Sequence, residues 1–213
     1  MEISFLGHAA FKIKGKGAIV VTDPFDDSIG IKFPKIEADI VTVTHDHFDH
    51  NASTKIAGEP FIINGPGEYE VKGVEIVGVA SFHDNKEGKE RGKNTIYNIK
   101  IDKINVAHLG DLGQESLTAE QIEEIGNVDI LLIPIGGYFT IDGAQASKIA
   151  SQLEPKIVIP MHFKDVEINI SELDGQEKFL KEMGKENVES LPKLSITAEK
   201  LPEETQIVLL TKS

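Results

Sequence analysis

The feature that most constrains this chain is a run of metal-ligand side chains, with His45, His47, Asp49 and His50 inside six residues. Directly before the run lies the apolar, β-branched segment 38–43, which is typical of a buried strand. The cluster therefore sits where a strand ends, in a loop that a rigid sheet holds in place. Packing several imidazoles and a carboxylate there is costly unless a partner satisfies them, and a bound metal ion would do so.

The spacing within the run indicates two metal positions. His45 and His47 are two residues apart and can point the same way from extended backbone, whereas Asp49 and His50 turn toward a second position. Imidazole nitrogens and carboxylate oxygens are ligands that suit Zn²⁺, Mn²⁺ and Fe²⁺. The run thus predicts half of a site for two metal ions.

Further candidate ligands stand at the ends of other predicted strands. His83 follows the alternating segment 74–82, Asp111 follows the apolar segment 104–107, and His162 closes another apolar segment. The α/β folds gather their chemistry on the rim where strands run into loops. Each residue alone could equally be a capping or hydrogen-bonded side chain, so the prediction depends on their joint placement.

This pattern resembles the metallo-β-lactamase superfamily, and within it the lactonase-type (UlaG-like) branch of metal-dependent hydrolases. The matching segments, spread over most of the chain, are 5–11, 21–25, 44–50, 108–113, 134–140 and 159–162. The resemblance implies a four-layer αββα sandwich, with two sheets between layers of helices. It also implies hydrolysis by a hydroxide that bridges two metal ions.

The resemblance gives each candidate residue a role. The implied ligands are His45, His47 and His83 for one metal ion and Asp49, His50 and His162 for the other, with Asp111 bridging the two. Asp23 matches an early Asp that orients the ligand loop. His8 and His108 lie near the ligands, where either could stabilise an oxyanion or move a proton. We expect Asp111, His8 and His108 to be catalytic, although His108 could instead only support the ligands.

The order of the predicted elements is mixed α/β, with no linker or repeat, so we expect a single domain over residues 1–213. The predicted strands are 2–6, 10–14, 18–22, 39–43, 60–63, 71–80, 95–101, 104–108, 129–134, 156–160 and 206–211. The predicted helices are 118–126, 142–153 and 172–183. Segment 65–70 reads as a turn and 86–93 as a mobile loop that could overhang the pocket. Segment 136–140 could line the pocket or pack under the sheet.

Charge and composition limit the classes of binding partner that the chain can have. A net charge of −13 argues against binding nucleic acid, which needs clustered Lys and Arg. The chain has no Cys, which excludes disulfides and thiolate metal ligands. No signal-peptide pattern or apolar run of about 20 residues is present, so we expect a cytoplasmic protein with a small-molecule substrate.

Four functional classes fit these features. The first is a hydrolase of small esters, lactones or related substrates that uses two divalent metal ions, with Zn²⁺ the first expectation and Mn²⁺ or Fe²⁺ the alternatives. The second is a phosphodiesterase or nuclease with the same metals. The third is a di-iron oxidoreductase, and the fourth is a metal-stabilised binding protein without turnover.

Overall fold

The computed structural model describes residues 1–213, and most of its strands belong to two large sheets. The first sheet has six strands in the order β15-β1-β2-β3-β5-β7. Their bounds are β1 (Glu2–Gly7), β2 (Ala10–Lys14), β3 (Ile19–Thr22), β5 (Ile40–Thr42), β7 (Phe61–Ile63) and β15 (Leu194–Ser195). The sheet is thus built almost entirely from the N-terminal third of the chain.

The second sheet has seven strands in the order β16-β13-β12-β11-β10-β9-β8. Their bounds are β8 (Gly67–Val71), β9 (Val74–Phe82), β10 (Lys93–Ile101), β11 (Ile104–His108), β12 (Ile130–Pro134), β13 (Ile157–Met161) and β16 (Gln206–Ile207). The C-terminal chain adds short strands to both sheets, because β15 pairs with β1 and β16 pairs with β13.

The remaining elements are short. Two further strand pairs join β4 (Ile36–Glu37) to β6 (Ile56–Ala57) and β14 (Ser190–Leu191) to β17 (Leu209–Leu210). The helices are α1 (Ala119–Ile125), α2 (Gly143–Leu153) and α3 (Gln176–Glu182), with 3₁₀ turns at Asp27–Ile29, Ser53–Lys55 and Ala198–Lys200. A bilayer could not be crossed by any of these helices, because even α2 has only 11 residues.

Side chains alternate between two cores, as the two-residue period of a strand requires. In β12, Ile130 and Leu132 face a cluster between the two sheets, whereas Leu131 and Ile133 face a second cluster with the helices. The inter-sheet cluster contains 24 buried residues drawn from both sheets. The second sheet is therefore covered on both faces, which explains why its central strands read as continuous apolar runs.

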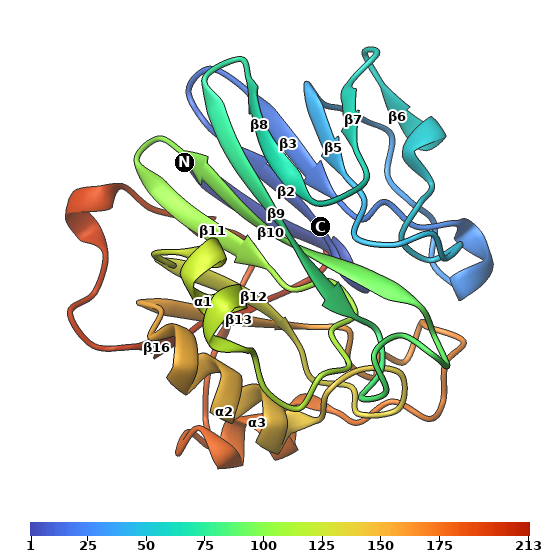
Figure 1. Cartoon of the computed structure of the whole chain (residues 1–213), viewed down its shortest axis with the longest axis vertical. Coiled ribbons are helices and arrows are strands. Elements are labelled where there is room, and N and C mark those ends of the chain that lie inside the picture. The colour runs from blue at the N-terminus through green and yellow to red at the C-terminus, as the bar shows by residue number, and fades with distance from the viewer.

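The structure confirms the two-sheet α/β sandwich, with one difference in its outer layers. Figure 1 shows α1, α2 and α3 together on the side of the second sheet, away from the blue N-terminal strands. The outer face of the first sheet is covered instead by loops and 3₁₀ turns that bury Phe25, Ile29 and Ile56. Pro24 and Pro34 lie in this covering segment, where proline opposes a longer helix.

Two of the predicted strands are divided in the structure. The predicted strand 71–80 contains a hairpin turn at Lys72 and Gly73, both at positive φ, so that β8 and β9 are separate strands. The segment predicted as a turn at 65–70 belongs largely to β8. The predicted strand 206–211 is divided at Val208 into β16 and β17, which pair with different partners.

The predicted helices are found, with one shortened. Both α1 and α2 begin at capping boxes, in which Thr118 pairs with Gln121 and Asp142 with Gln145. The helix predicted over 172–183 is wrong at its start, because α3 begins only at Gln176 after Gly175. Glycine at the N-cap and the absence of a capping side chain leave the preceding residues outside the helix.

Strand direction explains where the candidate ligands meet. In the first sheet β1, β3 and β5 run in one direction, and His8, Asp23 and His45 follow their C-terminal ends. In the second sheet β9, β11, β12 and β13 also run parallel to one another, and His83, Asp111 and His162 follow three of them. Direct contacts join the two rims, including the amide of His162 donating to the carbonyl of His8 at 2.8 Å.

Candidate metal centre

The candidate ligands form two groups in space. His45, His47 and His83 make one group, and Asp49, His50 and His162 make the other together with His8. Within each group, one ligand atom of every residue lies within 4.8 Å of all the others. A third set, Asp23, His45 and His50, meets the same criterion, so the two groups adjoin at His45 and His50. The grouping of His45 with His47, and of Asp49 with His50, agrees with the spacing of the run.

Asp111 lies between the two groups. Its Oδ2 is 3.3 Å from His83 Nε2 and 3.2 Å from His162 Nε2, and its Oδ1 is 3.2 Å from His50 Nε2. His45 Nε2 is 3.9 Å away from Oδ2. Burial opposes ionisation of Asp111, but the imidazoles of His162 and His50 outweigh it and hold its pKa well below the usual range. The residue is therefore a buried carboxylate in contact with members of both groups.

The polar atoms at the centre fit a cation. His45 Nε2, His50 Nε2, His162 Nε2 and Asp111 Oδ1 are buried without a hydrogen-bond partner. Buried polar atoms normally have partners, and leaving one unpaired costs about 1–3 kcal/mol. Burial, and then the neighbouring His50, lower the pKa of His45 to about 3, so its ring is neutral at pH 7. Imidazoles and carboxylates turned toward shared points are a donor set for divalent metal ions, which bind an imidazole in its neutral form.

A single carboxylate orients one ligand in each group. Asp23 is fully buried and accepts hydrogen bonds from the Thr44 amide at 2.8 Å, the Thr44 hydroxyl at 2.6 Å and His50 Nδ1 at 2.8 Å. Because the Thr44 hydroxyl donates to Asp23, it is free to accept from His45 Nδ1 at 3.0 Å. Nδ1 of both rings is thereby occupied, so Nε2 is the nitrogen that His45 and His50 would offer to a metal ion. Burial opposes protonation of His50, but Asp111 and Asp23 outweigh it and hold the pKa of His50 well above its usual value, so a metal ion would displace a proton from this ring.

The two outer histidines are placed differently from the ligands. Neither His8 nor His108 lines the pocket. His8 Nε2 lies 3.1 Å from Asp49 Oδ2, and burial followed by His162 lowers the pKa of His8 to about 4, so the neutral ring donates this hydrogen bond. The contact favours positioning of Asp49 over direct catalysis.

His108 is a support between two strand ends. Its Nε2 donates to the Ala9 carbonyl at 2.8 Å, and its Nδ1 accepts from the Gly110 amide at 3.2 Å. Both ring nitrogens are therefore occupied by backbone groups, and the side chain is fully buried. Of the two roles open to it from the sequence, this geometry favours support of the site over contact with substrate.

Three residues of the centre have left-handed backbone. His8, Asp23 and His162 have φ of 56°, 41° and 50°, and each directly follows a strand. Non-glycine residues adopt this conformation rarely, at a cost of order 1–3 kcal/mol each. The sharp turns bring the side chains to the centre, and the two sheets hold the backbone in place.

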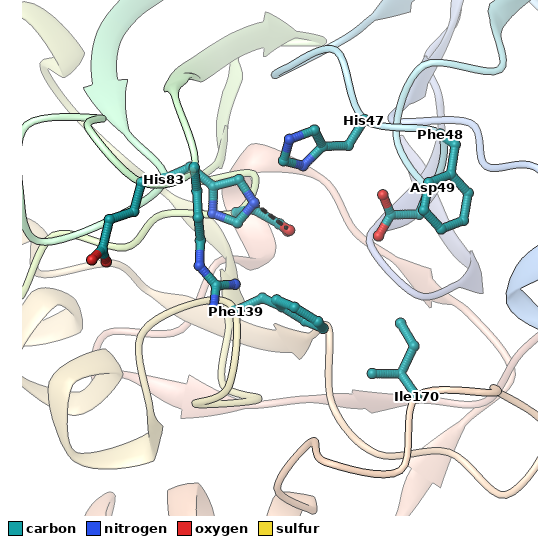
Figure 2. Close-up of a pocket in the computed structure, with 9 residues that line it drawn as sticks. His47, Phe48, Asp49, His83, Phe139 and Ile170 are labelled. Atoms are coloured by element: carbon teal, nitrogen blue, oxygen red, sulfur yellow. Dashed lines mark ion pairs between the residues drawn. The ribbon is translucent and has the colours of Figure 1, made fainter.

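A pocket of about 480 Å³ opens beside the ligands. It is lined by His47, Phe48, Asp49, His83, Glu90, Arg91, Asp111, Phe139 and Ile170. Figure 2 shows His47, Asp49 and His83 around the opening, with Phe139 and Ile170 across from His47. The expectation that segments 86–93 and 136–140 could contribute to the pocket is confirmed by Arg91 and Phe139. The volume suits a small organic molecule.

Several lining residues were not identified from the sequence. Phe48 lies inside the ligand run but carries no chemical signal of its own, and Ile170 lies in a loop 59 residues beyond Asp111. The role of Asp84 was also not predicted, although an Asp before a Gly-containing polar segment is a known signal for side-chain capping of a loop. Only the folded chain shows that Phe48 and Ile170 share one cavity with the ligands.

Comparison with known proteins gives consistent matches. Residues 2–162 match the family model described as the Beta-lactamase superfamily domain. A UPF0173 metal-dependent hydrolase of Thermococcus onnurineus is 33% identical over 190 residues, which cover 76% of this chain and 84% of that protein. A Thermotoga maritima protein, classed in its crystal structure as a Zn-dependent hydrolase of the metallo-β-lactamase superfamily, aligns with a TM-score of 0.81 at 37% identity. That alignment covers 98% of this chain and 97% of the other.

A more distant structure agrees in fold. Igni18, a metallo hydrolase from Ignicoccus hospitalis, aligns with a TM-score of 0.68 at 21% identity. The alignment covers 92% of this chain and 99% of Igni18, and at this identity it supports the fold alone.

Proposed function

This chain belongs to the β-lactamase superfamily and is a metal-dependent hydrolase, and we propose that it cleaves a small ester or lactone with two divalent metal ions. One observation carries the proposal. Two groups of ligand atoms meet at the buried carboxylate of Asp111, beside an open pocket. We propose His45, His47 and His83 as ligands of one ion and Asp49, His50 and His162 as ligands of the other, with Asp111 shared. Zn²⁺ is our first choice of metal, with Mn²⁺ or Fe²⁺ as alternatives.

Two divalent cations held there would supply a water of lowered pKa as nucleophile and an electrophile for the scissile carbonyl. The protein's own residues position the metal ligands and shape the pocket. Asp23 and Thr44 keep the imidazoles of His45 and His50 in the tautomer that can bind metal. His8 holds Asp49 through a hydrogen bond. Phe48, Phe139 and Ile170 line the pocket with apolar surface, which would exclude bulk water around a bound substrate.

The alternative is a phosphodiesterase or nuclease with the same metal centre. A pocket of about 480 Å³ and a net charge of −13 support a small substrate over a polyanionic one. Among the residues that line the pocket, Arg91 is the only Lys or Arg. A nucleic-acid backbone would need several such contacts.

The first test compares two neighbouring carboxylates of the same run. Asp49 belongs to a ligand group and lines the pocket beside the ligands, whereas Asp46 is exposed, belongs to no group and does not line that pocket. We expect wild type and Asp46→Asn to carry close to two metal ions per chain after purification without chelators, and Asp49→Asn to carry close to one. Elemental analysis measures this directly. Two ions in Asp49→Asn, or none in wild type even after titration with Zn²⁺, Mn²⁺ and Fe²⁺, would contradict the proposed centre.

The second test is a substrate screen with each metal supplied separately. We expect cleavage of carboxylic esters or lactones by wild type, with most of the activity lost in Asp49→Asn and kept in Asp46→Asn. Cleavage of bis(4-nitrophenyl) phosphate alone would replace the proposal by the phosphodiesterase alternative.

A further inference from the structure

The loop after His83 is tied to the carboxylate of Asp84. Its Oδ1 accepts from the amides of Lys86 and Gly88 at 2.8 and 2.9 Å, and its Oδ2 accepts from those of Glu90 and Arg91 at 2.9 and 2.8 Å. Burial opposes the ionisation of Asp84, but these four donors outweigh it and lower its pKa to about 2. The segment expected from the sequence to be a mobile loop is therefore bound at four backbone positions.

This loop places Arg91 in the wall of the pocket. The Arg91 guanidinium carbon lies 4.6 Å from the ring centroid of Phe139 and 6.0 Å from that of Tyr138. The neighbouring Glu90 is already paired with Lys86 at 2.6 Å, whereas the Arg91 guanidinium has no carboxylate within 4.0 Å and donates no hydrogen bond. Arg91 is thus a half-buried cation without a protein counter-charge, beside the metal centre.

The contact with the Phe139 ring leaves the donors of Arg91 available. An aromatic ring contacts a guanidinium through its face, so the N–H groups around its edge stay free to donate. A fork of parallel N–H donors matches the two oxygens of a carboxylate. Because the backbone amide of Arg91 and its side chain are both held, less conformational entropy is lost when an anion binds.

Other parts of the pocket wall are apolar. Phe48, Phe139 and Ile170 present apolar surface, and Figure 2 places Ile170 and Phe139 on the side across from His47. A substrate that fits these walls has a short apolar middle, a carbonyl end toward the ligands His47, Asp49 and His83, and an anionic end toward Arg91.

We propose that Arg91 selects anionic substrates, so that the preferred ester or lactone carries a carboxylate separated from the scissile carbonyl by a short apolar chain. This rests on the proposed hydrolase function. In the reaction, water adds its oxygen to the acyl carbon, the acyl carbon–oxygen bond breaks, and the leaving oxygen takes the proton that the water gives up. The distal carboxylate is unchanged and serves only for binding.

A matched pair of esters tests the proposal. Mono(4-nitrophenyl) glutarate and 4-nitrophenyl pentanoate have the same chain length and leaving group, and differ in a terminal carboxylate against a methyl group. Metal-loaded wild type, Arg91→Met, Arg91→Lys and Lys89→Met are compared by kcat/KM. Lys89 is a suitable control because it lies in the same loop, is exposed, pairs with Glu87 and does not line the pocket.

We expect Arg91→Met to lower kcat/KM for the glutarate ester about 10- to 100-fold, the size of one charge-assisted hydrogen-bonding contact. The pentanoate ester should be nearly unaffected. Arg91→Lys should restore part of the loss, and Lys89→Met should match wild type on both esters. An equal effect of Arg91→Met on the two esters, or no effect on either, overturns the proposal.

A binding measurement separates this proposal from the hydrolase function. Glutarate is titrated calorimetrically into metal-loaded wild type and Arg91→Met, after elemental analysis shows equal metal content. Weaker binding to Arg91→Met, by about tenfold or more, supports the anion site even if neither ester is cleaved. Equal binding overturns it, whatever the activity.

Discussion

Asp23→Asn is expected to weaken both metal positions although Asp23 is not proposed as a ligand of either. The carboxylate accepts from the Thr44 amide through Oδ1, and from the Thr44 hydroxyl and His50 Nδ1 through Oδ2. An amide has one oxygen, so its NH₂ group must face at least one of these donors. If it faces His50, the ring avoids the clash by moving its proton to Nε2, where it removes the lone pair that a metal ion needs.

The size of the effect follows from these contacts. When the variant binds metal, the proton of His50 must stay on Nδ1, where it no longer donates to a charged carboxylate. The lost hydrogen bond to a charged group is worth about 1.5–3 kcal/mol of metal-binding free energy. This corresponds to a rise of about 10- to 100-fold in the Kd of the group that contains His50, the range found when partners of metal ligands are removed. The group that contains His45 should be affected less, because Thr44 intervenes.

Two threonine variants serve as comparisons. Thr44→Val removes the hydroxyl that accepts from His45 Nδ1, and should weaken the group that contains His45 more than the other. Thr42→Val is the matched control, because the buried Thr42 hydroxyl has no hydrogen-bond partner. Competitive titration of the metal-free proteins with Zn²⁺ against a chromophoric chelator gives both dissociation constants. Wild-type affinity for both ions in folded Asp23→Asn would refute the reasoning.

Three further predictions concern stability. His108→Ala should lower the free energy of unfolding by about 2–4 kcal/mol in urea titrations, because it opens a cavity and leaves the Ala9 carbonyl unpaired, with metal content unchanged. Asp84→Asn should lower the free energy of unfolding of the metal-free protein by about 2 kcal/mol at pH 7. The lowering of the Asp84 pKa from 3.8 to about 2 in the folded state implies this size. Because the folded-state pKa is the lower one, that difference should persist above about pH 4 and vanish as the pH falls through 2, and a pH-independent difference would contradict it. A free metal concentration of about 1,000 times Kd adds about 4 kcal/mol to the free energy of unfolding. Removing the metal with a chelator should therefore lower Tm by roughly 10 °C in scanning calorimetry, whereas an unchanged Tm would argue against bound metal.

Local patterns in the sequence were sufficient for much of the fold. Continuous or alternating apolar runs located most strands. The capping box at Thr118 located the start of one helix, and helical spacing from Asp142 located another. The boundaries failed where backbone conformation decided them. The turn at Lys72 and Gly73 sits inside an apolar-rich stretch, and the covering of the first sheet by loops depends on packing that no periodicity encodes.

For the candidate site, the sequence determined the chemistry and the tertiary structure decided the arrangement. The run from His45 to His50 specifies nitrogen and oxygen donors at a strand end, because residue type and local spacing are enough to fix donor identity. The assembly of these donors around Asp111, the link from Asp23 through Thr44 to His45, and the position of Arg91 over Phe139 join residues far apart in the chain. Such contacts arise only when parallel strands of two packed sheets bring their C-terminal ends to a common rim.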